Sequence, residues 1–184
     1  MRGALLVAIA AVLAATGVSP AARPRKPADS EELRQLMVED QADRESKAID
    51  WAVVRPRDRA RLARVKALHA GGLIRTAEDY YHAALVLQHG EVPEDSLLAH
   101  EFCVAAMMLG KNDIESSSLG AAAEDRFLMN IGRPQRFGTQ FRRDDTGPWR
   151  LYVVGDGVTD ALRRLMGEPS LAEARAREAE MNGK

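Results

Sequence analysis

Polar and charged side chains that could do chemistry lie within apolar helical stripes of this sequence. At about 100° per residue, Asp40 and Arg44 fall in the stripe of a first predicted helix, and Gln88, Glu101 and Asp125 fall in the stripes of three later ones. A buried charge without a partner is very costly, so these groups must meet partners inside the protein.

Two interpretations of these groups are open. In the first, they form an internal network in which Asp40 pairs with Arg44, Asp125 pairs with Arg126, and Gln88 ties one helix to another. In the second, they line a polar pocket in which Glu101 and Asp125 form an acid/base pair. Two carboxylates in a cleft of low dielectric constant push their pKa values apart, as acid/base catalysis requires.

The histidines suggest a metal site only weakly. His82, His89 and His100, together with Glu101, have the ligand types of a zinc site. His82 and His89 lie opposite the apolar stripe of their helix, and His89 comes just before Gly90, where an imidazolium suits the helix dipole. We therefore expect exposed or capping histidines and no metal. Motifs for nucleotide, metal-hydrolase or serine-hydrolase chemistry are missing from the sequence, so we also expect no cofactor.

The N-terminus predicts export to the periplasm or the extracellular space. Arg2 precedes an uncharged apolar run from Ala4 to Val18, and small residues follow at positions that a signal peptidase reads. We expect a signal peptide over 1–21, a disordered Pro/Arg-rich linker over 22–28 and one domain over 29–184. The apolar run is too short to span a membrane comfortably, so no stable membrane insertion is expected once the signal is cleaved.

Charge and cysteine content narrow the classes of partner. The chain has 26 basic and 27 acidic residues, a balance that argues against nucleic acid as the main partner. Cys103 is the single cysteine, so an internal disulfide is impossible, and its Ala and Met neighbours favour a buried, inert thiol.

The start and stop signals predict an all-α fold, a short antiparallel helical bundle. Caps and glycines place helices from Asp29 through Ala48, from Pro56 to Gly71, from Thr76 to Gly90, from Pro93 to Gly110, and from Asn112 or Asp113 to Gly132. The third and fourth helices have the small-residue rhythm of Sel1-like or tetratricopeptide hairpins, without a second copy. Beyond them we expect a β-rich segment at "WRLYVV", a short helix after Thr159 and a last helix from Leu171.

The stretch "EDRFLMNIGRPQRFGTQF", from Glu124 to Phe141, predicts an ordered loop folded over the mouth of the bundle. Pro134 ends the preceding helix, and Gly138 permits a turn that a side chain would obstruct. Gln135 and Gln140 supply amide groups that a surface loop rarely needs. We expect both amides to point inward, toward Asp40, Arg44 or Asp125.

Three segments resemble an uncharacterised, mainly bacterial family, a domain of unknown function. They are "DQADR" from Asp40, "LQHG" from Leu87, and the stretch from Glu124, which fits D-R-x-L…G-x-P-Q-[RK]-[YF]-G-T-Q. The resemblance covers nearly all of the chain after the predicted signal peptide and implies no activity. It implies these shared polar positions: Asp40, Asp43, Arg44, Gln88, His89, Asp125, Arg126, Gln135, Thr139 and Gln140.

Two functions therefore stand side by side. The first is an exported binding or interaction module for a protein or small-molecule ligand, with a polar site between the helices and the Gly-Arg-Pro-Gln-Arg-Phe-Gly-Thr-Gln loop. The second is a small exported hydrolase that uses Glu101 and Asp125, with His89 or Gln140 assisting.

Overall fold

The computed structural model describes residues 26–45, 48–144 and 146–183, and within these ranges the fold is all-α. The predicted signal peptide over 1–21 and residues 22–25 of the linker lie outside the described residues. The helices are α1 (Glu31–Ala42), α2 (Trp51–Ala70), α3 (Ala77–Leu87), α4 (Pro93–Met108), α5 (Ile114–Asn130), α6 (Asp160–Leu165) and α7 (Leu171–Asn182). Two short antiparallel strands, β1 (Phe141–Arg142) and β2 (Arg150–Leu151), complete the described elements.

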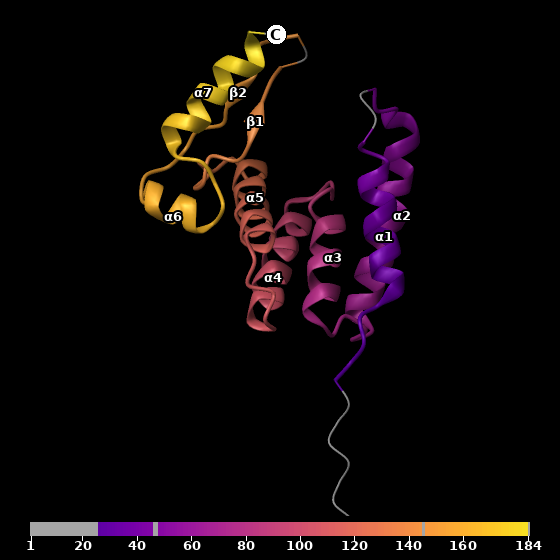
Figure 1. The fold of residues 1–184 in the computed structure, drawn as a ribbon. Coiled ribbons are helices and arrows are strands. Elements are labelled where there is room, and N and C mark those ends of the chain that lie inside the picture. Colours follow the sequence, from indigo (N-terminus) through magenta and orange to yellow (C-terminus); the bar gives the residue numbers. More distant parts are fainter. Residues whose placement is uncertain (1–25, 46–47, 145, 184) are drawn as a thin grey trace, which may run out of the picture.

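The first five helices lie in a row, with the C-terminal elements at one end (Figure 1). The hairpin of α1 and α2 packs on α3, α3 packs on α4, and α4 packs on α5. Their shared core consists mainly of aliphatic and small residues, among them Leu33, Val65, Leu87 and Cys103, together with the aromatic Phe102. The small residues on α4 and α5 allow the helix axes to come close, and Gly120 of α5 faces the Cβ of Cys103.

Side-chain caps explain most helix starts. Thr76 and Asp79 form a reciprocal capping box on α3, as predicted, and Asp113 caps α5 by accepting from the backbone N–H of Ser116. Asp79 also accepts from the backbone N–H of Ser30 at 2.6 Å, which fixes the start of α1 against α3. Ser30, and not Asp29, is the N-cap of α1.

The sequence misplaced two helix ends beside the site. α1 ends at Ala42 and does not reach Ala48, because Asp43 and Arg44 turn to meet α2. α2 begins at Trp51, five residues before the predicted start at Pro56, because Asp50 caps it by accepting from the N–H of Ala52 at 3.0 Å. Pro56 therefore lies inside the helix, where it removes one hydrogen bond.

The C-terminal elements close around the loop that follows α5. Strand β2 falls within the predicted "WRLYVV" segment but is only two residues long, and Gln135 makes a further bridge to Val154. Glu178 of α7 accepts from the N–H of Leu151, and Arg163 of α6 donates to the carbonyls of Arg136 and Phe137. Loop, strands and α6–α7 thus form one packed unit on α5.

Gly90, in the turn between α3 and α4, should not tolerate a side chain. A Cβ there would overlap Asp95, which is buried and paired with Lys66. We expect Gly90→Ala to lower the free energy of unfolding by about 1–3 kcal/mol, the usual cost of overpacking, in a urea titration. Gly71→Ala is the matched control, because a Cβ at Gly71 meets nothing closer than 3.4 Å. Equal unfolding free energies for the two variants would show that this turn is not tightly packed.

Candidate functional site

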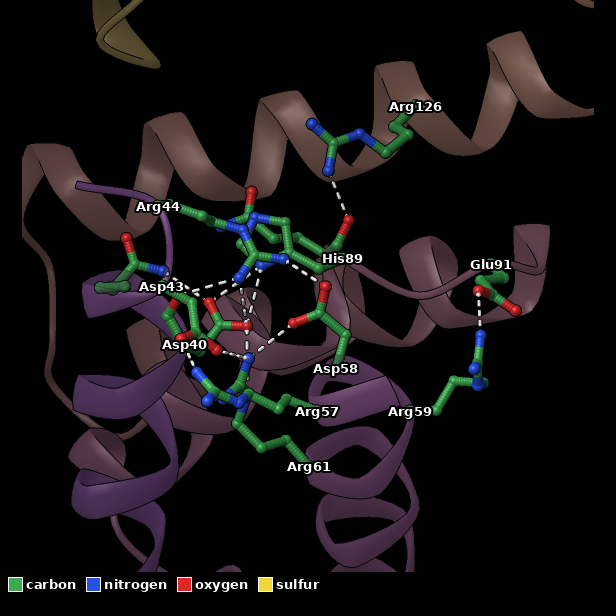
Figure 2. A network of polar contacts seen from close by, with 12 residues as sticks. Asp40, Asp43, Arg44, Arg57, Asp58, Arg59, Arg61, His89, Glu91 and Arg126 are labelled. Carbon is green, nitrogen blue, oxygen red and sulfur yellow. Dashed lines mark hydrogen bonds and ion pairs between the residues drawn. The ribbon is translucent and has the colours of Figure 1, made fainter. Parts of the chain in front are cut away.

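Asp40, in the last turn of α1, is the centre of a buried network of charges (Figure 2). Its side chain is completely buried and accepts hydrogen bonds from three groups. Arg44 Nη1 lies 3.1 Å from Oδ1, His89 Nδ1 lies 2.9 Å from Oδ2, and Gln41 Nε2 lies 2.8 Å from Oδ2. The carboxylate thereby joins α1 to the end of α3. The pair of Asp40 with Arg44 that the internal-network interpretation predicted is present.

Two further carboxylates complete the network between α1 and α2. Asp58 accepts from Arg44 at 2.8 Å and from Arg61 at 2.7 Å, and Asp43 accepts from Arg61 at 2.8 Å and from Arg57 at 2.7 Å. These arginines lower the pKa of Asp43, with the hydrogen bond from Arg61 as the largest cause. Negative and positive groups are balanced here, so this part of the network holds the two helices together.

Arg126 of α5 is different, because it forms no ion pair with the described residues. Its Nη1 donates to the backbone carbonyl of Gln88, and its Nε donates to Oε1 of Gln140 at 3.2 Å. The predicted pair with Asp125 does not form. Burial lowers the pKa of the Arg126 guanidinium, and the neighbouring positive charge of Arg44 lowers it further. An arginine still remains charged at such a site, so Arg126 presents an unneutralised positive charge.

That charge faces a cavity of about 320 Å³ between α2, the α3–α4 turn and α5, which we call the arginine cavity. Its lining includes Arg44, Arg55, Arg59, Arg126, His89, Asp58, Glu91, Trp51 and Leu62. Four guanidinium groups face two carboxylates, so the lining is positively charged. Figure 2 shows Arg126 on the opposite side of the site from Asp58 and Arg59.

Asp125, the residue directly before Arg126, is fully buried. Its side chain binds the loop that follows α5 rather than an arginine. Its carboxylate accepts from the backbone N–H groups of Arg136 at 2.6 Å, Phe137 at 2.9 Å and Thr139 at 3.0 Å, and from Thr139 Oγ1 at 2.9 Å. All four donors come from the Pro-Gln-Arg-Phe-Gly-Thr-Gln loop. Asp125 is therefore the anchor that folds this loop against α5.

Gln135 and Gln140 both point inward, but toward other partners than Asp40, Arg44 or Asp125. Gln135 is completely buried and exchanges hydrogen bonds with the backbone of Gln140, donating to its carbonyl and accepting from its N–H. Gln140 accepts from Arg126 Nε and donates to the carbonyl of Ala122. The loop amides thus satisfy the loop itself and hold Arg126 in place.

The expected acid/base pair of Glu101 and Asp125 is wrong. Glu101 is exposed on α4, whose buried face runs through Ala99, Phe102, Cys103 and Ala106. This face was misjudged because most of its buried residues besides Phe102 are small, whereas the larger Leu109 is exposed. Asp125 is fully engaged with the loop, so it has no free oxygen for proton transfer.

The expectation that His89 is exposed or capping is also wrong, since it is largely buried against Asp40. His100 Nδ1 lies 3.0 Å from the backbone carbonyl oxygen of Gly120. Among the described residues, no cluster of His, Cys, Asp and Glu has the arrangement of a metal site. Burial raises the pKa of the Cys103 thiol to about 12, which makes it inert.

Sequence reasoning missed the contribution of α2. Asp58 and Arg61 lie three residues apart, the spacing of neighbours on a helix face, and Arg55 and Arg59 flank Asp58. This pattern could have indicated that α2 carries a charged face toward Asp40. The early helix start at Trp51, which brings Arg55 into the helix, had only the Asp50 cap as its signal.

Comparisons of the chain with protein-family models, curated proteins and solved structures gave no match. No helix among the described residues has the length and apolar character needed to cross a membrane.

Asp125→Ala should cost more than about 2 kcal/mol of unfolding free energy, because three loop N–H groups would lose their acceptor in a buried setting. Chemical denaturation followed by circular dichroism measures this cost. Asp156→Ala, at an exposed position whose side chain makes no hydrogen bond or ion pair with the described residues, should change stability by less than about 0.5 kcal/mol. A loss at Asp125 as small as this control would refute its role as the loop anchor.

Proposed function

We propose that this protein is an exported binding module that captures an anionic group of a small molecule in the arginine cavity. The observation that carries the proposal is Arg126, a largely buried guanidinium without a carboxylate partner among the described residues. Proteins rarely bury a charge without compensation, so a ligand anion is the natural partner of this group.

The charges around Arg126 support an anion rather than a cation. Asp58 is already shared by Arg44 and Arg61, and Glu91 lies 3.3 Å from Arg59 on the exposed rim. Arg55 lines the same cavity and forms no ion pair with the described residues. Once these pairs are counted, Arg55 and Arg126 leave two positive charges available.

The apolar part of the lining favours a ligand that is more than a simple ion. Trp51 is about half exposed and lines the cavity together with Leu62. An aromatic ring and an aliphatic side chain beside guanidinium groups suit an anion attached to an apolar or aromatic group. A second, larger hollow beside Asp43 offers no comparable site, because Asp43 is already paired with Arg57 and Arg61 there.

Export and family membership belong to the same proposal. The N-terminal apolar run supports a signal peptide, and the three resembling segments supply Asp40, His89 and Arg126 to one site. This convergence supports membership of the family of unknown function that the sequence resembles. The alternative hydrolase based on Glu101 and Asp125 loses its support, since Glu101 is exposed.

Isothermal titration calorimetry with inorganic phosphate at low ionic strength tests the proposal. We expect Arg126→Gln to weaken phosphate binding at least tenfold, about 1.4 kcal/mol, because it removes the unpaired charge while an amide can still donate to the Gln88 carbonyl. Salt should weaken binding to the wild-type protein.

Arg133→Gln is the matched control, because it removes the same charge at an exposed position just beyond α5. Its phosphate affinity should equal that of the wild type. Equal affinities of Arg126→Gln and the wild type, with both proteins folded by circular dichroism, would contradict an anion site at Arg126.

A further inference from the structure

The arginine cavity also contains a histidine that is arranged as a proton acceptor. We propose that Asp40 and His89 act together as a general base that hydrolyses phosphodiesters held by Arg126. This inference rests on the proposed anion site and adds a reaction to it.

The hydrogen bonds of His89 define which ring nitrogen is available. Nδ1 lies 2.9 Å from Oδ2 and 3.2 Å from Oδ1 of Asp40. The same carboxylate is also paired with Arg44 and Arg61. A carboxylate can only accept there, so Nδ1 carries the proton in the neutral imidazole, and Nε2 carries a lone pair. Nε2 makes no hydrogen bond to the described residues, and His89 lines the arginine cavity.

His89 and Arg126 are held by the same turn of the chain. Arg126 Nη1 donates to the carbonyl of Gln88, the residue directly before His89. Arg126 Nη2 makes no hydrogen bond to the described residues, so this edge is free to bind one phosphate oxygen. Arg126 and His89 line the same cavity, and Figure 2 shows both side chains on the same side of Asp40, so an anion bound by Arg126 would share this cavity with the imidazole ring.

The reaction needs water and no other co-reactant. His89 Nε2 takes a proton from water as the water oxygen forms a bond to phosphorus, and the bond from phosphorus to the leaving oxygen breaks. The leaving group departs with the electron pair as a phenolate or similarly stable oxyanion. Arg126 stabilises the negative charge that builds up on the phosphate oxygens, and the imidazolium later returns its proton to solvent.

A phosphodiester fits this site better than a phosphomonoester. A diester carries a single negative charge, which the free edge of Arg126 can bind while the guanidinium of Arg55, the second without an ion pair among the described residues, stays exposed to solvent. Trp51 and Leu62 provide an apolar wall for an aromatic ester group. No residue among those lining the cavity is placed as a dedicated acid for a poor leaving group, since Asp58 is paired with Arg44 and Arg61.

Hydrolysis of bis(p-nitrophenyl) phosphate, followed by the absorbance of p-nitrophenolate, tests the inference. The protein used spans residues 22–184, without the predicted signal peptide. We expect turnover above the buffer rate that increases with pH, because a general base acts in its unprotonated form. His89→Gln should lower kcat at least 100-fold with little change in KM, because the base is lost and Arg126 is kept.

Asp40 is a positioning residue, and Asp40→Asn should lower kcat and alter the pH profile while KM stays near the wild-type value. His69→Gln, at an exposed histidine of α2 outside the cavity, is the control and should leave the rate unchanged. Circular dichroism identifies variants that fail to fold, and the His89→Gln result stands independently of Asp40→Asn.

The outcomes separate the two proposals. Phosphate binding that depends on Arg126, without hydrolysis above the buffer rate, would overturn the catalytic inference and leave the binding module intact. Hydrolysis by folded His89→Gln at the wild-type rate would equally overturn it. If the wild-type protein neither binds phosphate nor hydrolyses the diester, the binding proposal and the catalytic inference are both overturned.

Discussion

The structure depends on the pairing of one buried carboxylate, that of Asp40. Because the charge is fully buried, it must be met by positive groups and hydrogen-bond donors, and these come from α2 and from the residues that follow α1 and α3. Arg44 follows α1, Arg61 belongs to α2, and His89 follows α3. The same requirement that fixes the helices relative to one another therefore also fixes the orientation of the imidazole that faces the cavity.

A second buried carboxylate, that of Asp125 on α5, also positions the structure around it through its hydrogen bonds. Asp125 gathers the backbone of the loop after α5, and the loop amide of Gln140 in turn accepts from Arg126. The Asp40–Arg44 pair of the internal-network interpretation is present, whereas Glu101 and Asp125 do not share a pocket; the arginine cavity, lined by other residues, lies beside the network. The inner groups are balanced and structural, and the outer edge, with Arg126 and His89, carries the uncompensated charge and the free ring nitrogen.

The sequence predicted the helices with strong local signals and failed where tertiary contacts decide. The start of α3 was predicted from the Thr76–Asp79 capping box, that of α4 from Pro93 and that of α5 from the Asp113 cap. These predictions succeeded because capping is a local interaction. The end of α1 depends on ion pairs to α2, which no local pattern encodes.

The sequence identified several residues of the candidate site, but it did not predict which of them pair with one another. Asp40, Arg44, His89 and Arg126 were all expected to contribute, yet their partners depend on how α1, α3 and α5 pack. Glu101 shows the limit most clearly. Apart from Phe102, the buried apolar residues of α4 are small, and a prediction that weights residues by hydrophobicity therefore places the buried face too close to the larger leucines.

Side-chain ¹⁵N NMR of the arginine Nε–H groups during a titration with inorganic phosphate tests the central claim most directly. We expect the Arg126 Nε–H resonance, assigned by its absence from the spectrum of Arg126→Gln, to be well dispersed and to shift to saturation, while exposed arginines such as Arg34 shift little. A uniform small shift of all arginine resonances, or an Arg126 signal that does not respond to phosphate, would contradict an anion site in the arginine cavity.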